Sequence, residues 1–346
     1  MPLVPPRYSK QALFNGIGPE GQAALAGKRV LVCGCGATGG VHVETLARAG
    51  VGSLRIVDRD FVELTNLQRQ LLFDEADARE QAPKAVAAAE KARAINGDID
   101  VEPVVADIGP ENILSLAGGC DLLLDGTDNF ETRFLINDAA HELGTPWIYC
   151  GVIGSHGQTM TILPGQTACL RCLIEAPPDP GTLETCDTAG VIAPAVLAVA
   201  SLACAEALKL LVGRTDLIGP RLLSLDVWEG SLREIDTRPL VANGGCVACR
   251  EGTRTWLNGT KSTRTAILCG RNAVQITPGV RSELDLVELA ERLSSTGSVR
   301  RTPYLVRLHA DDPRCELTIF RDGRAIVQGT EDIAVARSIY SRLVGL

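Results

Sequence analysis

Four cysteines in two C-x2-C pairs carry the most specific chemical signal in this 346-residue sequence. The pairs are Cys169 with Cys172 and Cys246 with Cys249. Four thiolates can surround Zn²⁺ as a tetrahedron, and such a closed site keeps no open position for a substrate. We therefore expect a structural zinc site that joins the two segments, with free thiols as the alternative.

Cys186 stands apart from these pairs, in the polar segment GTLETCDTAG that precedes a long apolar run. A cysteine near a helix N-terminus tends to have a lowered pKa and greater reactivity. A covalent role and an incidental loop thiol both stay open. Other cysteines lie in apolar stretches and are expected to pack in the core: Cys33, Cys35, Cys120, Cys150 and Cys204.

A glycine turn follows the apolar run RVLVC. Gly34, Gly36 and Gly39 fit the pattern G-x-G-x-x-G. Glycines let the backbone approach a phosphate, and the helix that follows offers its N–H groups. Asp58 ends the next strand about twenty residues later, where a ribose-binding acid belongs. The pattern predicts a nucleotide site without saying which nucleotide, and a plain tight turn is the alternative.

Cations, amides and acids gather after the strands of the same region. ATP brings a triphosphate and usually Mg²⁺, so its site needs several cations and a metal-binding carboxylate. Nothing in this group demands hydride chemistry, so the residues favour ATP over a nicotinamide dinucleotide. Each residue alone also has a simple structural explanation: Arg69 or Lys84 could be solvated at the surface, and Asn129 could cap the helix that begins at 131. The group comprises Asp60, Asn66, Gln68, Arg69, Lys84, Asp125, Asp128 and Asn129.

The elements that must position these residues alternate between strand and helix. Helices are expected over 77–96, 131–144 and 189–213. The alternation predicts an α/β fold with a doubly wound, mostly parallel Rossmann-like sheet, a mixed-strand extension and a ligand site at the strand C-termini. We place the nucleotide and zinc sites in a domain at 1–252 and a small α+β domain of unknown role at 253–346.

Composition limits the classes of partner. The net charge is −8, which argues against a nucleic-acid partner, since these proteins present a basic face. The N-terminus lacks the basic and then apolar run of a signal peptide. The longest apolar stretch, 189–213, contains Pro194, Glu206 and Lys209, so we expect a core helix and no membrane span. A cytoplasmic protein is expected.

Several motifs together resemble the ThiF/MoeB/HesA family of bacterial adenylyltransferases, which are related to ubiquitin-activating enzymes. The resemblance covers about residues 7–250, and "TNLQRQ" and "DGTDN" make it specific. The motifs are RYSKQ (7–11), GCGATGG (34–40), AGVGSLRIVDRDFVELTNLQRQ (49–70), APK (82–84), DGTDN (125–129) and AGVIAP (189–194).

The resemblance implies a reaction. The C-terminal Gly-Gly carboxylate of a small ubiquitin-fold sulfur-carrier protein would attack the α-phosphate of ATP and release pyrophosphate. It also implies a homodimer and a carrier that serves thiamin, molybdopterin or another sulfur product. The implied roles are ribose binding by Asp58, nucleotide ordering by Asn66, phosphate binding by Arg69 and Lys84, Mg²⁺ binding by Asp128, zinc binding by the four paired cysteines, and sulfur transfer or covalent linkage at Cys186.

One position departs from the family pattern. In the N-terminal segment R-Y-x-R-Q the family's second arginine reaches the nucleotide, often from the partner subunit, and here that position is Lys10. Lysine offers a point charge in place of a bidentate fork. A non-catalytic ATP-binding scaffold is therefore the first alternative function. An NAD-dependent oxidoreductase is a weaker one, since no catalytic pair is evident.

The segment from Cys315 to Arg321 matches a C-x5-R catalytic loop, but ELTIF alternates as a strand does and no glycine-rich cradle lies between the ends. We expect a strand at this place.

Overall fold

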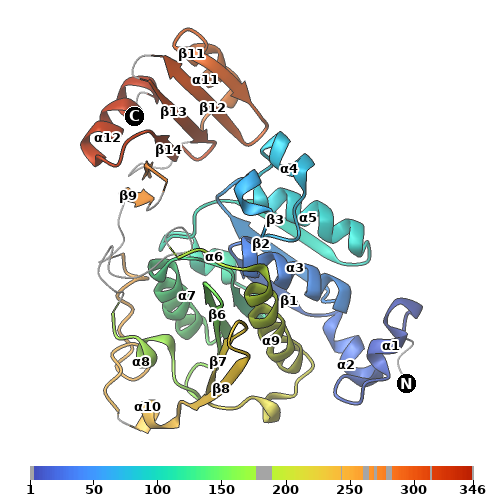
Figure 1. Cartoon of the computed structure of the whole chain (residues 1–346). Coiled ribbons are helices and arrows are strands. Elements are labelled where there is room, and N and C mark those ends of the chain that lie inside the picture. Colours follow the sequence, from blue (N-terminus) through green and yellow to red (C-terminus); the bar gives the residue numbers. More distant parts are fainter. Residues whose placement is uncertain are drawn as a thin grey trace. The chain divides into compact units, whose positions relative to one another are not determined.

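A computed structural model describes residues 4–176, 189–242, 244–259, 265–268, 271–277, 283–311 and 314–344. The chain divides into two compact units, Met1–Lys261 and Ser262–Leu346 (Figure 1). Each unit is described by itself below.

The first unit is built on an eight-stranded sheet in the order β3-β2-β1-β4-β5-β6-β7-β8. The first five strands of this order are parallel to one another, and the last three are added antiparallel. The expected parallel sheet with a mixed extension is confirmed. The strands are β1 (Arg29–Cys33), β2 (Ser53–Asp58), β3 (Asp100–Val105), β4 (Leu122–Asp125), β5 (Trp147–Ile153), β6 (His156–Ile162), β7 (Arg221–Asp226) and β8 (Ser231–Asp236).

Helices cover both faces of this sheet, as alternate apolar residues of each buried strand require. Val30 and Val32 of β1 pack in a core with α3 (Ala37–Ala49), α5 (Lys84–Ile95) and α9 (Ala193–Leu211). Leu31 and Cys33 point to the other face and pack with α6 (Ile113–Ala117) and α7 (Phe130–Leu143). The shorter helices are η1 (Pro6–Tyr8), α1 (Ser9–Ala12), α2 (Gly18–Leu25), η2 (Leu64–Asn66), α4 (Glu75–Glu80), α8 (Leu170–Leu173), η3 (Thr215–Leu217) and α10 (Arg238–Ala242).

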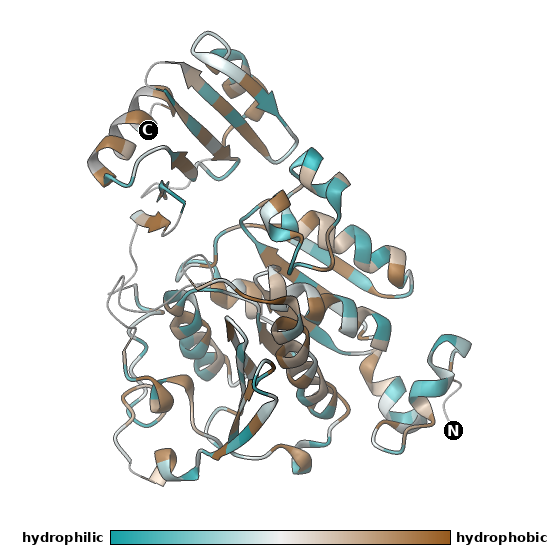
Figure 2. Ribbon diagram, viewed as in Figure 1, coloured by the Kyte–Doolittle hydropathy of each residue, from teal (hydrophilic) through white to brown (hydrophobic). Residues whose placement is uncertain are grey.

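Helix α9 is apolar along most of its length (Figure 2), and among the described residues it alone is long and apolar enough to cross a membrane. It packs against α3, β5 and β6. Its Glu206 is buried and accepts a hydrogen bond from Lys209 at 2.7 Å. The helix is therefore part of the core, as its sequence predicts.

The single helix expected over 77–96 is wrong, because the chain forms two helices there. Gln81 ends α4 in the left-handed conformation with φ 50°, and Pro83 is the N-cap of α5. Proline has no N–H to continue a helix and disfavours helical geometry in the residue before it. The break makes Lys84 the first residue of α5, and its backbone N donates to the Asp60 carbonyl at 2.9 Å.

The second unit has a six-stranded antiparallel sheet in the order β11-β12-β13-β14-β10-β9. Helices α11 (Leu286–Leu293) and α12 (Ile333–Val344) pack on one of its faces. The segment after Cys315 lies in β13, which agrees with the expected strand. The strands are β9 (Thr265–Leu268), β10 (Ala273–Ile276), β11 (Gly297–Arg301), β12 (Leu305–Asp311), β13 (Arg314–Phe320) and β14 (Ala325–Gln328).

Candidate nucleotide and metal sites

The outer two glycines of the turn after β1 are required by the fold. Gly34 has φ +83°, and a Cβ there would lie 2.8 Å from the Gly126 carbonyl oxygen. A Cβ on Gly39 would lie 2.0 Å from the Gly34 carbonyl oxygen. Both positions therefore exclude a side chain because one backbone crosses another at close range.

Gly36 is different, because a Cβ there would meet nothing closer than 3.7 Å, where the Gln70 amide nitrogen lies. Gly36 is the N-cap of α3, and it provides no side-chain acceptor for the N–H groups of the first turn. Open space and the helix N–H groups fit a phosphate at this turn.

Asp58 lies at the end of β2 and faces the glycine turn. Its carboxylate accepts hydrogen bonds from the backbone N of Cys35 at 2.6 Å and of Asp60 at 2.7 Å. Burial raises the pKa of Asp58, and the nearby Lys84 ammonium opposes this rise. The side chain is thus fixed at the place where a ribose would follow a phosphate bound by the turn.

Two cations meet the acids beside Asp58. The Lys84 ammonium is buried, and it lies 3.5 Å from an Asp60 carboxylate oxygen. The Arg59 guanidinium lies 3.1 Å from Asp107 and 3.8 Å from Asp60. Burial disfavours the charge of Arg59, but the carboxylates, Asp107 first among them, outweigh burial and raise its pKa. The Arg59 side chain therefore carries positive charge at this edge of the sheet.

The loop 64–70 is held by its own amides. Asn66 is buried, and its Oδ1 accepts from the Glu63 backbone N at 3.3 Å. Gln68 donates to the Val191 carbonyl at 3.4 Å, which links the loop to the segment before α9. Arg69 donates to the Thr65 carbonyl at 3.0 Å and is half-buried. Asn66 and Gln68 shape the loop that carries Arg69.

The segment after β4 is anchored by a buried ion pair that the sequence analysis missed. Asp125 accepts from Arg133 Nε at 2.9 Å and from both the N–H and the hydroxyl of Thr127 at 2.9 and 2.7 Å. The Arg133 guanidinium also lies over the rings of Phe130 and Tyr149, 5.5 and 5.2 Å from their centroids. This packing fixes the start of the segment 125–129.

Asp128 and Asn129 end this segment with different environments. Asp128 is exposed, and a carboxylate oxygen is the kind of ligand that Mg²⁺ prefers. Asn129 is the N-cap of α7, and its side chain accepts from the Thr132 backbone N at 2.9 Å. Asn129 therefore has a structural role as a helix cap, which needs no ligand to explain it.

These groups follow the C-terminal ends of the parallel strands, whereas Lys10 lies on the side of the sheet where those strands begin. The next residue, Gln11, donates to the Ala49 carbonyl at 2.8 Å, at the C-terminal end of α3. The glycine turn is at the other end of this thirteen-residue helix, about 20 Å away. The fold therefore does not bring the exposed Lys10 to the nucleotide residues of its own chain.

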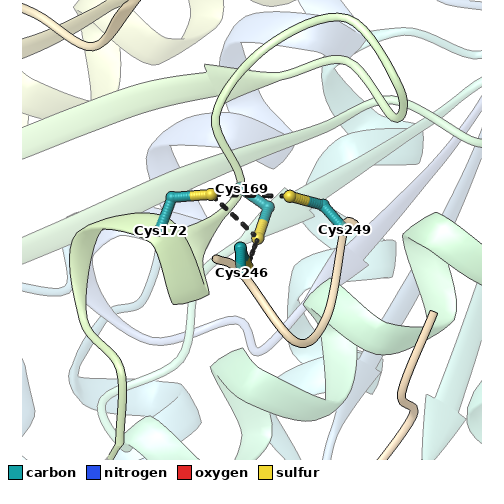
Figure 3. Close-up of side chains that lie close together, drawn as sticks. All are labelled: Cys169, Cys172, Cys246 and Cys249. Atoms are coloured by element: carbon teal, nitrogen blue, oxygen red, sulfur yellow. Dashed lines mark hydrogen bonds between the residues drawn. The ribbon is translucent and has the colours of Figure 1, made fainter. Parts of the chain in front are cut away.

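The four paired cysteines converge (Figure 3). All four sulfur atoms lie within 4.8 Å of one another, and the hydrogen-bonded sulfur pairs are 3.5 to 3.8 Å apart. A tetrahedron with Zn–S bonds of about 2.3 Å has edges of about 3.8 Å. The hydrogen bond between Cys169 and Cys172 lowers the pKa of the Cys172 thiol and raises that of the Cys169 thiol. Number, distance and donor type all fit Zn²⁺.

Cys186 lies outside the described residues. The five cysteines expected to pack in the core are all buried: Cys33, Cys35, Cys120, Cys150 and Cys204.

Sequence reasoning missed four further residues of the nucleotide edge. Arg59 stands between two acids that were selected, and Asp107 follows β3 as Asp58 ends β2, so position relative to the strand ends could have found both. Gln70 and Arg133 carried no such signal, because their roles depend on contacts across the fold.

Comparisons with known proteins agree on one family. Residues 8–250 match the model described as the ThiF family. The chain is 45% identical over 340 residues to the sulfur carrier protein ThiS adenylyltransferase of Bacillus subtilis (strain 168), covering 98% of this chain and 99% of that protein. It is 37% identical to the SAMP-activating enzyme E1 of Haloferax volcanii, covering 71% of this chain and 89% of that one.

Among solved structures, E. coli MccB has a TM-score of 0.58 at 22% identity, covering 68% of this chain and 72% of that chain. At this identity the likeness concerns the fold alone. It supports an α/β fold of this type for the chain.

Proposed function

Because this chain belongs to the ThiF family, we propose that it transfers the adenylyl group of ATP to the C-terminal Gly-Gly carboxylate of a small ubiquitin-like sulfur-carrier protein. ATP-dependent adenylyl transfer is the enzyme class of the chain. The observation that carries the proposal is the 45% identity to the Bacillus ThiS adenylyltransferase over nearly the whole of both chains. The clustered nucleotide residues at the edge of the sheet support it.

The reaction forms one bond and breaks one. A carboxylate oxygen of the carrier attacks the α-phosphorus of ATP, and the bond from that phosphorus to the bridging oxygen of pyrophosphate breaks. The products are an acyl adenylate and pyrophosphate. The attacking group is already a carboxylate, so the enzyme needs no general base. Its work is to position the two substrates and to offset the developing negative charge.

The nucleotide would lie along the edge of the sheet. N–H groups of the glycine turn would bind phosphate oxygens, and Asp58 would bind the ribose hydroxyls. Lys84 and Arg69 would offset charge on the phosphates, and the buried position of Lys84 would strengthen its effect because water screens it less. Asp128 would hold Mg²⁺, which offsets further phosphate charge.

The remaining assignments concern the parts around this edge. The four-cysteine cluster would hold a structural Zn²⁺. Cys186 would take part in sulfur transfer or a covalent link after adenylation, as the resemblance implies. The enzyme would act in the cytoplasm as a homodimer, on a carrier of the thiamin or molybdopterin type. The placement of Lys10 far from the nucleotide residues of its own chain favours a second copy.

ATP–pyrophosphate exchange tests the function directly. We expect exchange only when a small protein ending in Gly-Gly is present. Arg69→Ala should lower the exchange rate by about 100-fold, because it removes charge from the transition state. Arg48→Ala is the matched control, since Arg48 is exposed on α3 and pairs only locally with Glu44.

The two failures have different meanings. ATP binding without exchange for any carrier would support the non-catalytic scaffold. Absence of ATP binding would reject the nucleotide site itself.

A further inference from the structure

Arg59 lies among the candidate nucleotide residues at the C-terminal ends of the strands. It directly follows Asp58, the expected ribose acid, and reaches the loop after β3 through Asp107 at 3.1 Å. Its charge also interacts with that of Asp128 in the segment after β4. The side chain therefore stands among the C-terminal ends of three strands, which is where ligands bind in open α/β sheets.

The contacts of Arg59 leave one mode of recognition favoured. Asp107 and Asp60 lie along the N–H edge of its guanidinium and offset its positive charge. An arginine already paired with carboxylates is a poor partner for a further anion, but its two flat faces can stack on a planar ring. About a quarter of the side chain is exposed (26%), so a ligand can reach it.

Arg133 shows the same arrangement inside this protein. Asp125 and two backbone carbonyls take up its N–H groups. Its guanidinium faces lie over the rings of Phe130 and Tyr149. Arg59 has the first half of this arrangement, an edge held by carboxylates.

The order of the groups along the edge indicates which part of the ligand meets Arg59. The glycine turn after β1 would take the phosphates, and Asp58 at the end of β2 would take the ribose. The next group of the nucleotide is the base, and the next residue of the chain is Arg59. A planar base and a planar guanidinium are matched in shape.

We propose that Arg59 contacts the adenine base of ATP by stacking and that Asp107 is a positioning residue that holds the guanidinium flat against it. The inference rests on the proposed function only in taking ATP as the nucleotide. It assigns Arg59 to base recognition, apart from the phosphates and the transferred group.

The test compares two ligands that share the phosphates and differ in the base. Calorimetry would measure the dissociation constants of Mg²⁺–ATP and Mg²⁺–tripolyphosphate for the full chain. Arg59→Ala should weaken ATP binding on the order of tenfold and leave tripolyphosphate binding unchanged. Arg59→Lys should behave alike, because it keeps the charge and loses the flat face. Asp107→Asn should give a smaller loss for ATP alone.

The matched control is Arg55→Ala. Arg55 of β2 pairs with Glu102 of β3 at 2.8 Å, so it ties the same two strands away from the ligand edge. This variant should lose stability in thermal unfolding and bind both ligands as the wild type does.

Three results would overturn the inference. Equal weakening of both ligands in Arg59→Ala would make Arg59 a phosphate contact. Unchanged binding of both ligands would show that the Arg59–Asp107 pair only connects two loops and that Arg59 does not contact the nucleotide. Loss of ATP affinity in Arg59→Ala but full retention in Arg59→Lys would show that charge alone matters. Wild-type protein that binds ATP through Arg59 but does not exchange pyrophosphate would reject adenylation and leave the base contact standing.

Discussion

The three glycines of the turn are alike in sequence and different in physical role. Gly34 and Gly39 make room for neighbouring backbone, whereas the space beside Gly36 is open within the protein. A glycine at a position where packing does not demand it is open to a group outside the chain. We propose that this group is a phosphate of the nucleotide.

This difference predicts opposite effects for two equal substitutions. Gly36→Ala should leave the unfolding temperature near that of the wild type and weaken ATP binding by at least about tenfold, because the methyl group intrudes on the phosphate. Gly39→Ala should destabilise the fold by about 3 kcal/mol or more, since its Cβ would lie 2.0 Å from a carbonyl oxygen. Thermal unfolding and ATP calorimetry on both variants would check this. Normal ATP binding by Gly36→Ala would contradict the phosphate assignment.

His42 is a second residue whose environment carries a prediction. Its ring is fully buried on α3, and neither ring nitrogen has a hydrogen-bond partner. Burial lowers its pKa from 6.5 to about 4. Above pH 6.5 the ring is neutral in both the folded and the unfolded chain. As the pH falls from 6.5 towards 4, only the unfolded chain takes up the proton, so folding stability is lost.

The free energy of unfolding should therefore fall by about 1.5 kcal/mol between pH 6.5 and pH 5 on account of His42. Urea unfolding at the two pH values would measure it. His42→Leu should reduce this pH dependence by that amount, and the control His156→Ala, whose side chain is 64% exposed, should keep it. An unchanged pH dependence in His42→Leu would show that the ring has an unseen partner.

At the scale of elements, the cysteine cluster joins segments that no strand pairing connects. Cys169 is the N-cap of the short helix α8 and Cys172 lies within that helix, whereas Cys246 and Cys249 follow α10. Trp256 packs near the same cluster and stacks on Phe134 of α7, with ring centroids 5.4 Å apart. A metal here would hold the C-terminal segment of the first unit against α7.

Removal of the metal should therefore loosen this region first. We expect about one Zn²⁺ per chain by elemental analysis. Cys246→Ser should lose the metal and at least about 3 kcal/mol of stability, because structural zinc binds with a free energy near 10 kcal/mol or more. Cys204→Ser, at a buried cysteine outside the cluster, should keep its zinc. Full stability after chelation would mean that the four thiols suffice without metal.

The break between α4 and α5 decides where Lys84, a candidate phosphate ligand, lies. A continuous helix would have placed Lys84 in its second turn. The left-handed Gln81 and the N-cap Pro83 restart the helix at Lys84, beside Asp60. Helical propensity in the alanine-rich sequence concealed the break, although the proline marks it.

At the scale of the whole molecule, Lys10 presents a geometric problem. The resemblance assigns it to the nucleotide, and the fold holds it near the far end of α3. A lysine side chain cannot cover about 20 Å. Any contact between Lys10 and a nucleotide must therefore involve the site of a second copy.

Mixing two inactive variants tests this. Lys10→Ala and Arg69→Ala should each lower pyrophosphate exchange when assayed alone. If Lys10 acts in the partner's site, a mixed dimer has one site with both residues intact, and activity should return to about a quarter of the wild-type value for random mixing. Absence of recovery in a mixture shown to exchange subunits would mean that Lys10 does not act across a dimer.

The sequence by itself determined the class of fold, the glycine turn, the cysteine pairs and the family. These depend on local patterns: apolar runs, glycine spacing and thiol spacing, each of which has a direct physical meaning along the chain. The tertiary structure decided which of the polar residues meet. Arg59 meets Asp107 and Gln70 faces Gly36 because separate strand ends converge at one edge, whereas Lys10 is carried to the other edge by the direction of α3. Such contacts depend on distances across the fold, which spacing along the sequence does not encode.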